Sequence, residues 1–204
     1  DKTLNAIDLS GDRAYLSANF GILVIDLKKR EVAETYRLDR RTTATALLAG
    51  SIYAATDSGL LSAPTTANLM DVGNWKRVSL SSLDFDDQNI VGLGACRDRF
   101  CFVASGGGLF YRDTDGSIKT LRKQTNLRGL TVVGNRLVAY TAEAMYVFAS
   151  LEGTGEAVSA GTVNGVTALT EDGRFWVASG RNGLIGLRRR AEGQYEKAIS
   201  GLKI

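Results

Sequence analysis

Reactive side chains are scarce in this sequence, and the missing type sets the first limit on its chemistry. The 204 residues contain no histidine and two cysteines, Cys96 and Cys101. Without an imidazole there is no Ser-His-Asp or Cys-His pair for nucleophilic catalysis and no histidine-ligated zinc. We therefore expect no catalytic residue, no metal site and no cofactor, and we interpret the protein as a non-enzyme.

The two cysteines flank a short segment whose pattern predicts a β-hairpin turn. If Asp98-Arg99 forms the turn, Cys96 lies directly opposite Cys101, where Cα atoms ~4.5 to 5.5 Å apart suit a disulfide. Two buried thiols in an apolar core would explain the same pattern. A zinc site is not expected, because no further soft ligand accompanies the pair.

Three other motifs could be interpreted as ligand sites, but each is better explained as a turn or a solvated loop. Residues 113–116, Asp-Thr-Asp-Gly, resemble the start of a calcium loop but lack its distant glutamate, so we interpret them as a hairpin turn. The acidic run at 84–87 is interpreted as solvated loop charge. The glycines at 106–108 precede a strand rather than a helix, which favours a tight turn over a phosphate site.

These residues lie within a repeated pattern. A cassette of apolar residues, a polar pair, a glycine and a new apolar run recurs five times, and its anchor falls at Gly21, Gly59, Gly108, Ala144 and Gly183. The spacing of about 40 residues is typical of a propeller blade. Each unit divides into four short strands separated by turn residues, and no segment shows a long helical stripe.

The predicted fold class is therefore all-β, a β-propeller with five four-stranded antiparallel blades. Their expected bounds are about 1–39, 40–82, 83–123, 124–160 and 161–204. Alternation places one residue per unit at an equivalent position facing a neighbouring sheet: Tyr15, Tyr53, Phe102, Val138 and Trp176. The repeats alone leave open whether five blades close on themselves or form an arc of a larger ring.

Composition excludes several partners. The chain carries 25 Lys plus Arg against 22 Asp plus Glu, a net charge of +3. This balance does not favour nucleic acid, whose binding needs concentrated basic surface. No apolar run approaches the roughly 20 residues of a membrane span.

Loops on one face of the predicted ring form the candidate binding surface. In a propeller, the loops between blades and those joining the second and third strands share a face, and such loops commonly bind ligands. The candidate ligand-binding residues there are Arg40, Arg41, Asp57, Asn126, Arg128, Glu143, Arg181 and Asn182, and Asp84, Asp86 and Gln124 are expected nearby. The basic runs at 28–30 and 188–190 are interpreted as solvated turns.

The first third of the chain carries a family resemblance. The segments 1–7, 14–17, 20–22 and 34–36, followed by 53–60 and Asn74-Trp75, resemble the N-terminal propeller of PorZ-type proteins of the Bacteroidetes. That propeller is similar to the two-component-regulator propeller repeats of periplasmic sensors. The resemblance implies about two further blades before this stretch, and thus an interior part of a seven-bladed ring.

The resemblance also implies a location and a role. It implies an extracytoplasmic chain, in the periplasm or at the outer-membrane surface, within a cell-surface attachment component of type IX secretion. The implied partners are proteins or an anionic glycan such as lipopolysaccharide. The alternative is the ligand-sensing propeller of a hybrid two-component sensor, since the same fold serves both roles.

Overall fold

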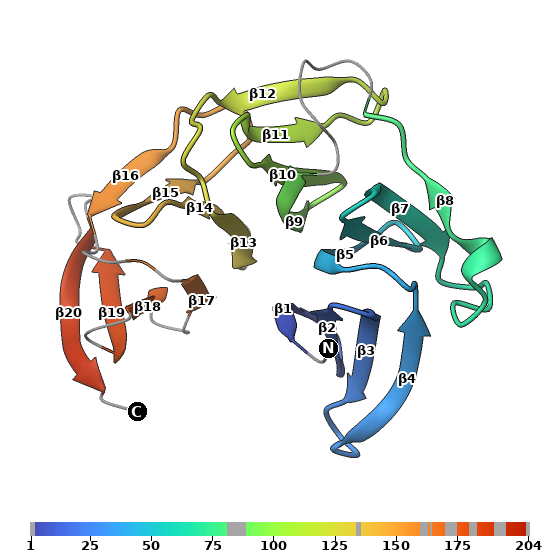
Figure 1. Ribbon diagram of the computed structural model, residues 1–204. Helices are drawn as coiled ribbons and strands as arrows, with labels where there is room; N and C mark the ends of the chain where they lie inside the picture. Colours follow the sequence, from blue (N-terminus) through green and yellow to red (C-terminus); the bar gives the residue numbers. More distant parts are fainter. Residues whose placement is uncertain are drawn as a thin grey trace.

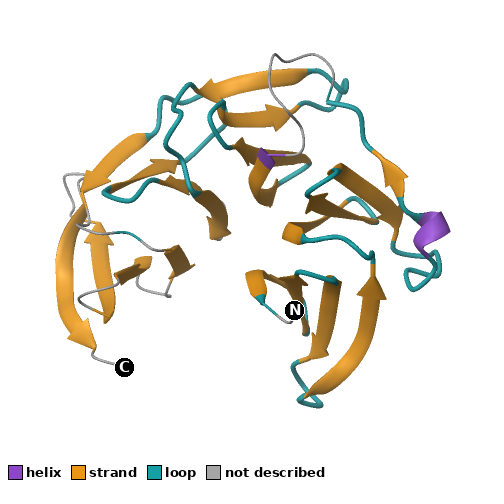
Figure 2. Cartoon of the chain, viewed as in Figure 1, coloured by secondary structure: helices purple, strands orange, loops and turns teal. Residues whose placement is uncertain are grey.

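The computed structural model describes residues 3–80, 89–133, 136–159 and 163, and the strands at 165–169, 175–179, 183–189 and 195–202. From residue 165 onward the description concerns essentially the backbone path and the strand pairing. Figure 1 shows four-stranded sheets arranged in an arc around an axis, each with its first strand innermost. Strands and loops account for almost all of the described chain, as Figure 2 shows.

The first two blades occupy the N-terminal part of the arc. Blade 1 consists of β1 (Leu4–Ser10), β2 (Arg13–Ala18), β3 (Gly21–Asp26) and β4 (Glu31–Arg37). Blade 2 consists of β5 (Thr42–Leu48), β6 (Ser51–Thr56), β7 (Gly59–Pro64) and the short β8 (Lys76–Arg77). A short 3-10 helix, η1 (Val72–Asn74), precedes β8 and is capped by the Asp71 side chain, which accepts a hydrogen bond from the Gly73 N–H.

Three further sheets continue the arc. Blade 3 consists of β9 (Ile90–Cys96), β10 (Arg99–Ala104), β11 (Gly108–Arg112) and β12 (Ile118–Arg122). Blade 4 consists of β13 (Gly129–Val133), β14 (Arg136–Tyr140), β15 (Ala144–Phe148) and β16 (Glu156–Ser159). The strands β17 (Gly165–Leu169), β18 (Phe175–Ser179), β19 (Gly183–Arg189) and β20 (Tyr195–Leu202) pair in the same order.

The predicted fold class is confirmed at the level of an all-β propeller with four-stranded antiparallel blades. The strands pair into five four-stranded sheets: four of these blades are described with their side chains, and the fifth, β17–β20, is described by its backbone. The seven-bladed ring stays a prediction.

The recurring glycine anchor has a steric cause. Gly21 and Gly108 open the third strand of their blades with φ of +134°, a conformation that L side chains rarely adopt. A Cβ atom on Gly21 would lie 2.1 Å from the Tyr36 carbonyl oxygen, and one on Gly108 would lie 2.4 Å from that of Arg122. In blades 1 and 3 the fourth strand therefore passes too close to the anchor glycine to admit a side chain there.

The core lies between successive sheets. Tyr15 and Tyr36 of blade 1 pack against Ile52 and Trp75 of blade 2, and the Tyr36 and Trp75 ring centroids are 6.2 Å apart. Between blades 2 and 3 the Phe102 ring is fully buried and stacks on Phe110 at 5.4 Å. Neighbouring blades thus bury the faces that they turn toward each other, as two-layer packing requires.

Polar contacts close to the axis join the blades as well. The hydroxyls of Ser17 and Thr45 lie 2.7 Å apart in a buried hydrogen bond between blades 1 and 2. The Asn5 amide donates to the Thr42 carbonyl at 2.8 Å, and the Thr43 hydroxyl donates to the Ile90 carbonyl at 2.7 Å. These buried and half-buried polar groups are thereby paired across the sheet boundary.

The predicted set of equivalent residues, one per blade, is wrong for Phe102 of blade 3. Tyr15 pairs with the third residue after Gly21, and Cys101, not Phe102, has the corresponding partner three residues after Gly108. The cause is a longer connection: three residues separate the paired Ala104 and Gly108, whereas two separate Ala18 and Gly21. Cys101 accordingly packs toward blade 4, and Phe102 packs back toward blade 2.

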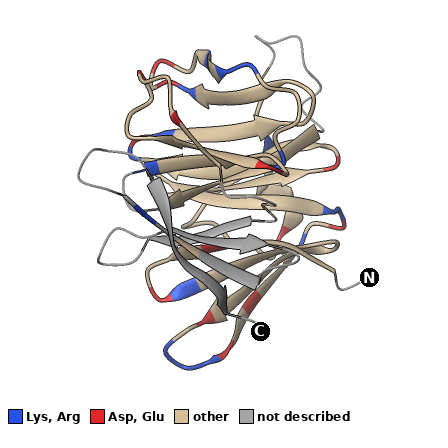
Figure 3. Cartoon of the chain, turned by 90° about the vertical axis from the view of Figure 1, so that its left-hand side faces the viewer, with Lys and Arg blue, Asp and Glu red and all other residues tan. Residues whose placement is uncertain are grey.

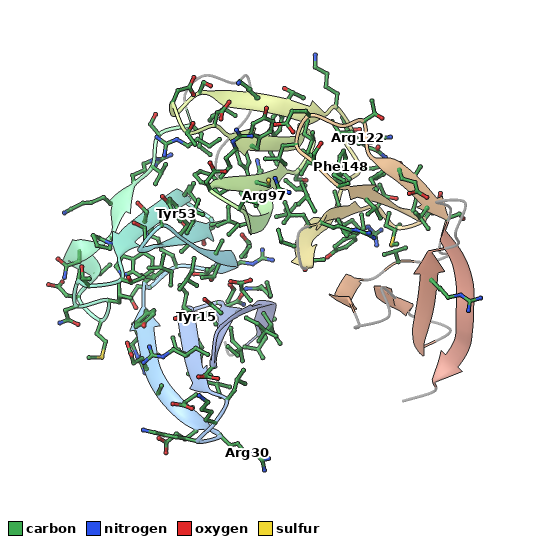
Figure 4. The ribbon with its side chains drawn as sticks, turned by 180° about the vertical axis from the view of Figure 1, so that it is seen from behind. Tyr15, Arg30, Tyr53, Arg97, Arg122 and Phe148 are labelled. Atoms are coloured by element: carbon green, nitrogen blue, oxygen red, sulfur yellow. The ribbon has the colours of Figure 1, made fainter. Side chains whose placement is uncertain are left out.

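The remaining members of the predicted set can be placed in part. Tyr53 and Val138 pair with residues three positions after their anchors, as Tyr15 does. Figure 4 shows that Tyr15 and Tyr53 come from neighbouring blades. The side chain of Trp176 lies outside the described residues.

We expect Phe102→Ala to lower the free energy of unfolding by about 3 to 5 kcal/mol, because it removes a fully buried ring from the interface of blades 2 and 3. Met70→Ala, at a side chain that is 64% exposed, is the control and should change stability by less than about 0.5 kcal/mol. Denaturant unfolding measures both, and equal losses would contradict the packing described.

The glycine anchor gives a second test. Gly50 has a φ of +73°, and a Cβ atom added there would meet open space. Gly50→Ala should therefore lower the free energy of unfolding by only about 1 kcal/mol, the cost of a left-handed backbone for a residue with a side chain. Gly21→Ala adds an overlap with the Tyr36 carbonyl, and a loss of about 3 kcal/mol or more is expected. Thermal unfolding of the two variants side by side would refute the steric explanation if their midpoints coincide.

Candidate functional site

The loops predicted to share a face do contact each other. The connection after β4 meets the β6–β7 turn, where the Asp57 N–H donates to the Arg41 carbonyl at 3.1 Å. The guanidinium of Arg40 donates to the Ser58 hydroxyl of the same turn. Arg40, Arg41 and Asp57 are all exposed, so this corner presents two cations beside one carboxylate. Figure 3 shows charged residues concentrated in turns and at strand ends.

A second part of this face lies on blade 4. Asn126, Arg128 and Glu143 are exposed, and the Arg128 N–H donates to the Tyr140 carbonyl at 2.8 Å. The Ala142 carbonyl accepts from the Val163 N–H at 2.8 Å, which fixes the turn that carries Glu143. The predicted residues therefore form two described groups, one at blades 1 and 2 and one at blade 4. Arg181, Asn182, Asp84 and Asp86 lie outside the described residues.

Beside Asn126 lies a stacked polar group that the sequence did not reveal. The Arg122 guanidinium lies over the Tyr146 ring, 3.7 Å from its centroid, and donates to the Gln124 amide oxygen at 2.7 Å. The Gln124 NH₂ donates in turn to the Tyr146 hydroxyl and to the Asn126 side chain, each at 2.9 Å. Stacking and hydrogen bonds together hold these side chains in one arrangement.

The inner strands line a small cavity near the axis. It measures about 140 Å³, and its polar lining includes Asn5, Asp8, Thr45, Arg128 and Tyr140. Burial raises the pKa of the half-buried Asp8 carboxyl to about 6, although the Leu9 N–H opposes the shift by hydrogen bonding. Asp8 was not predicted, because its surroundings come from strands far apart in the sequence.

The larger cavity lies on the opposite face, between blades 3 and 4. Its volume is about 410 Å³, and it is lined by the β9–β10 turn, by Val132, Arg136 and Leu137, and by residues 148–152. Phe148 and Leu137 give it an apolar wall. The sequence did not predict this cavity, since its walls come from three separate hairpins.

The arginine at the mouth of this cavity is held by two carboxylates. Arg99 Nε lies 3.0 Å from Asp113 Oδ1, and Arg99 Nη1 lies 3.3 Å from Glu152 of blade 4. The Lys119 ammonium, the Thr114 N–H and Arg99 hold the pKa of Asp113 below its usual range. Asp115 accepts from the Ser117 N–H at 2.8 Å, so the segment 113–116 forms a turn.

The cysteine register differs from the prediction. The turn is Arg97-Asp98, with Cys96 paired to Arg99 and Cys101 paired to Gly94. The two cysteines therefore lie diagonally on one face of the sheet and not directly opposite each other, and both are free and buried. Among the described residues, no group of three or more Cys, Asp or Glu could hold a metal ion, and no helix could cross a membrane.

Comparisons with known proteins show that this propeller is similar to PorZ. Residues 1–76 match the family described as the PorZ N-terminal β-propeller domain of type IX secretion. The structure is similar to PorZ, an essential surface component of the type IX secretion system of Porphyromonas gingivalis, with a TM-score of 0.82 and 25% identity. That match covers 98% of this chain and 26% of the PorZ chain. The predicted resemblance is thus confirmed.

A second match shows the same fold. The extracellular domain of a putative hybrid two-component system from B. thetaiotaomicron aligns with a TM-score of 0.66 and 13% identity, over 98% of this chain and 28% of that one. No curated protein matches the chain.

The raised pKa of Asp8 predicts how the stability of the protein depends on pH. The raised pKa means that the folded protein favours the protonated form of Asp8, so its contribution to stability is lost as the pH rises from about 4 through about 6. Asp8→Asn should therefore stabilise the protein at pH 8, by roughly 1 to 2 kcal/mol after allowance for solvent exposure, and much less at pH 4. Asp57→Asn, at an exposed carboxylate, is the control. A pH-independent effect of Asp8→Asn on unfolding would disprove the assignment.

Proposed function

We propose that this chain is an extracytoplasmic propeller binding module of a PorZ-like cell-surface component of type IX secretion. The observation that carries the proposal is the similarity to PorZ, which extends over 98% of this chain. The chain spans about a quarter of that protein, so its role is that of one module. The surface location of PorZ and the extracellular origin of the second match support the proposed location. The proposed role is non-enzymatic.

The proposed binding surface is the loop face, and the proposed ligand is an anionic glycan such as lipopolysaccharide. Arg40 and Arg41 are exposed on one connection between blades, and Arg128 is exposed on another. Guanidinium groups hold phosphates and carboxylates in bidentate geometry and stay charged at all relevant pH values. With a net charge of only +3, affinity has to come from these loop arginines and not from the overall charge.

Neighbouring polar residues would complete the site. Asp57, Asn126, Glu143 and Asn182 supply acceptors or amide donors for sugar hydroxyls, and Arg181 would add a further cation on the last blade. A protein partner is the other ligand class that this surface would suit, because loops on a rigid scaffold serve both.

Titration of the protein with anionic and neutral glycans tests the proposal. The triple variant Arg40→Ala, Arg41→Ala and Arg128→Ala should weaken anionic binding about tenfold or more, and binding should fall as salt shortens the Debye length to ~8 Å. Arg181→Ala extends the same series.

A variant of equal charge is the control. Lys28, Lys29 and Arg30 lie on the exposed β3–β4 turn, and their replacement by alanine should leave affinity within about twofold. If both triple variants bind alike, or if neutral and anionic glycans bind equally, the ligand-sensing propeller of a two-component system becomes the better hypothesis.

A further inference from the structure

The cavity between blades 3 and 4 gives one thiol a route to solvent. Cys96 lines this cavity of about 410 Å³, whereas Cys101 does not and has no exposed surface. Its volume is large enough for a small molecule, and Phe148 and Leu151 give it an apolar side. Figure 4 shows Arg97 and Phe148, which line it from neighbouring blades. The two cysteines therefore differ in access.

The two thiols also differ in their hydrogen bond. Cys101 donates to Cys96, and this bond, together with burial, raises the pKa of the Cys101 thiol. Cys101 therefore holds its proton in the resting protein, and Cys96 is the thiol that lines the cavity. The diagonal placement on one face of β9 and β10 brings the two side chains together.

The mouth of the cavity is basic. Arg97, Arg99 and Arg136 line it, against Asp98 and Glu152. Arg99 is held by Asp113 and Glu152, whereas Arg97 is exposed. Arg97 also has a φ of +60°, an uncommon conformation for a residue other than glycine or asparagine. Arginine near a partly accessible thiol is the environment in which cysteines react.

We propose that Cys96 and Cys101 form a dithiol site that reduces small anionic disulfides entering this cavity, with Cys96 attacking and Cys101 resolving. The proposal is independent of glycan binding, because the cavity lies on the face opposite the arginine loops. An aromatic or aliphatic disulfide with carboxylates suits the apolar wall and the Arg97 guanidinium.

The chemistry balances in two exchange steps. The Cys96 thiolate attacks one sulfur of the disulfide, a Cys96–ligand S–S bond forms, and the other half leaves as a thiolate. The Cys101 sulfur then attacks the Cys96 sulfur, the mixed disulfide breaks, and the leaving thiolate takes up the Cys101 proton. The two protein thiols are oxidised to one disulfide, and the incoming disulfide is reduced to two thiols.

The diagonal register of the two cysteines predicts which of the two exchange steps is slower. Diagonal Cα atoms lie ~7 to 8 Å apart, beyond the range that a disulfide spans without backbone movement. The second step therefore requires the Arg97-Asp98 turn to move, and it should be slower than the first.

Dithiobis(nitrobenzoate), a disulfide with two carboxylates, is the probe, and mass spectrometry with thionitrobenzoate release is the measurement. The native protein should release two equivalents and retain no label. Cys101→Ser should release one equivalent and retain the other half as a mixed disulfide. Cys96→Ser should react at least about tenfold more slowly while folded, because its remaining thiol is buried. Circular dichroism confirms that both variants are folded.

Arg97 is tested against a matched arginine. Arg30 also has a positive φ, of 58°, and lies on the β3–β4 turn of blade 1. Arg97→Gln should slow dithiobis(nitrobenzoate) severalfold and leave the neutral dithiodipyridine unchanged, whereas Arg30→Gln should affect neither probe.

Three results would overturn the proposal. The first is a folded Cys96→Ser variant that reacts as fast as Cys101→Ser, which would remove the asymmetry in access. The second is native protein that keeps the label, which would show that Cys101 does not resolve. The third is equal behaviour of the Arg97→Gln and Arg30→Gln variants toward the anionic probe.

Discussion

Packing between neighbouring sheets is the constraint on which this structure depends. A four-stranded sheet has two faces to bury, and a blade of about 40 residues has no second layer of its own. The clusters around Tyr36 and Trp75, around Phe102, and around Phe148 each lie between two blades. Stability is therefore shared between blades, and a side chain directed to the wrong neighbour would disturb two sheets at once.

This packing also determines where ligands can bind. Where neighbouring sheets cover each other's faces, the two sets of connecting loops and the axial cavity remain accessible. One set carries Arg40, Arg41 and Arg128 on loops tied by backbone hydrogen bonds. The other set encloses the cavity beside Cys96, where hairpin connections of blades 3 and 4 meet. Two separate chemistries can thus occupy opposite faces of one rigid scaffold.

The sequence was sufficient for the fold class because its strongest signal has a steric origin. The fourth strand passes within contact distance of the anchor, so glycine recurs at Gly21 and Gly108 and marks the blades. The face shared by Arg41 and Asp57 followed from topology alone, and the 3.1 Å hydrogen bond between their backbones agrees with it. The raised pKa of Asp8 could not be predicted in this way, because distant strands create its surroundings.

The two errors in blade 3 have one physical cause. Counting back from Gly108 assumed a two-residue connection, but three residues separate it from the paired Ala104. The shift of one residue exchanged Phe102 for Cys101, and it also placed the preceding turn at Asp98-Arg99 when it lies at Arg97-Asp98. Nothing local would have warned of this, since Arg97 adopts a positive φ that turn chemistry assigns to glycine or asparagine. The same shift moves the cysteines from directly opposed to diagonal positions. A pair that would have been a plain structural crosslink is instead two free thiols, one of them beside a basic cavity.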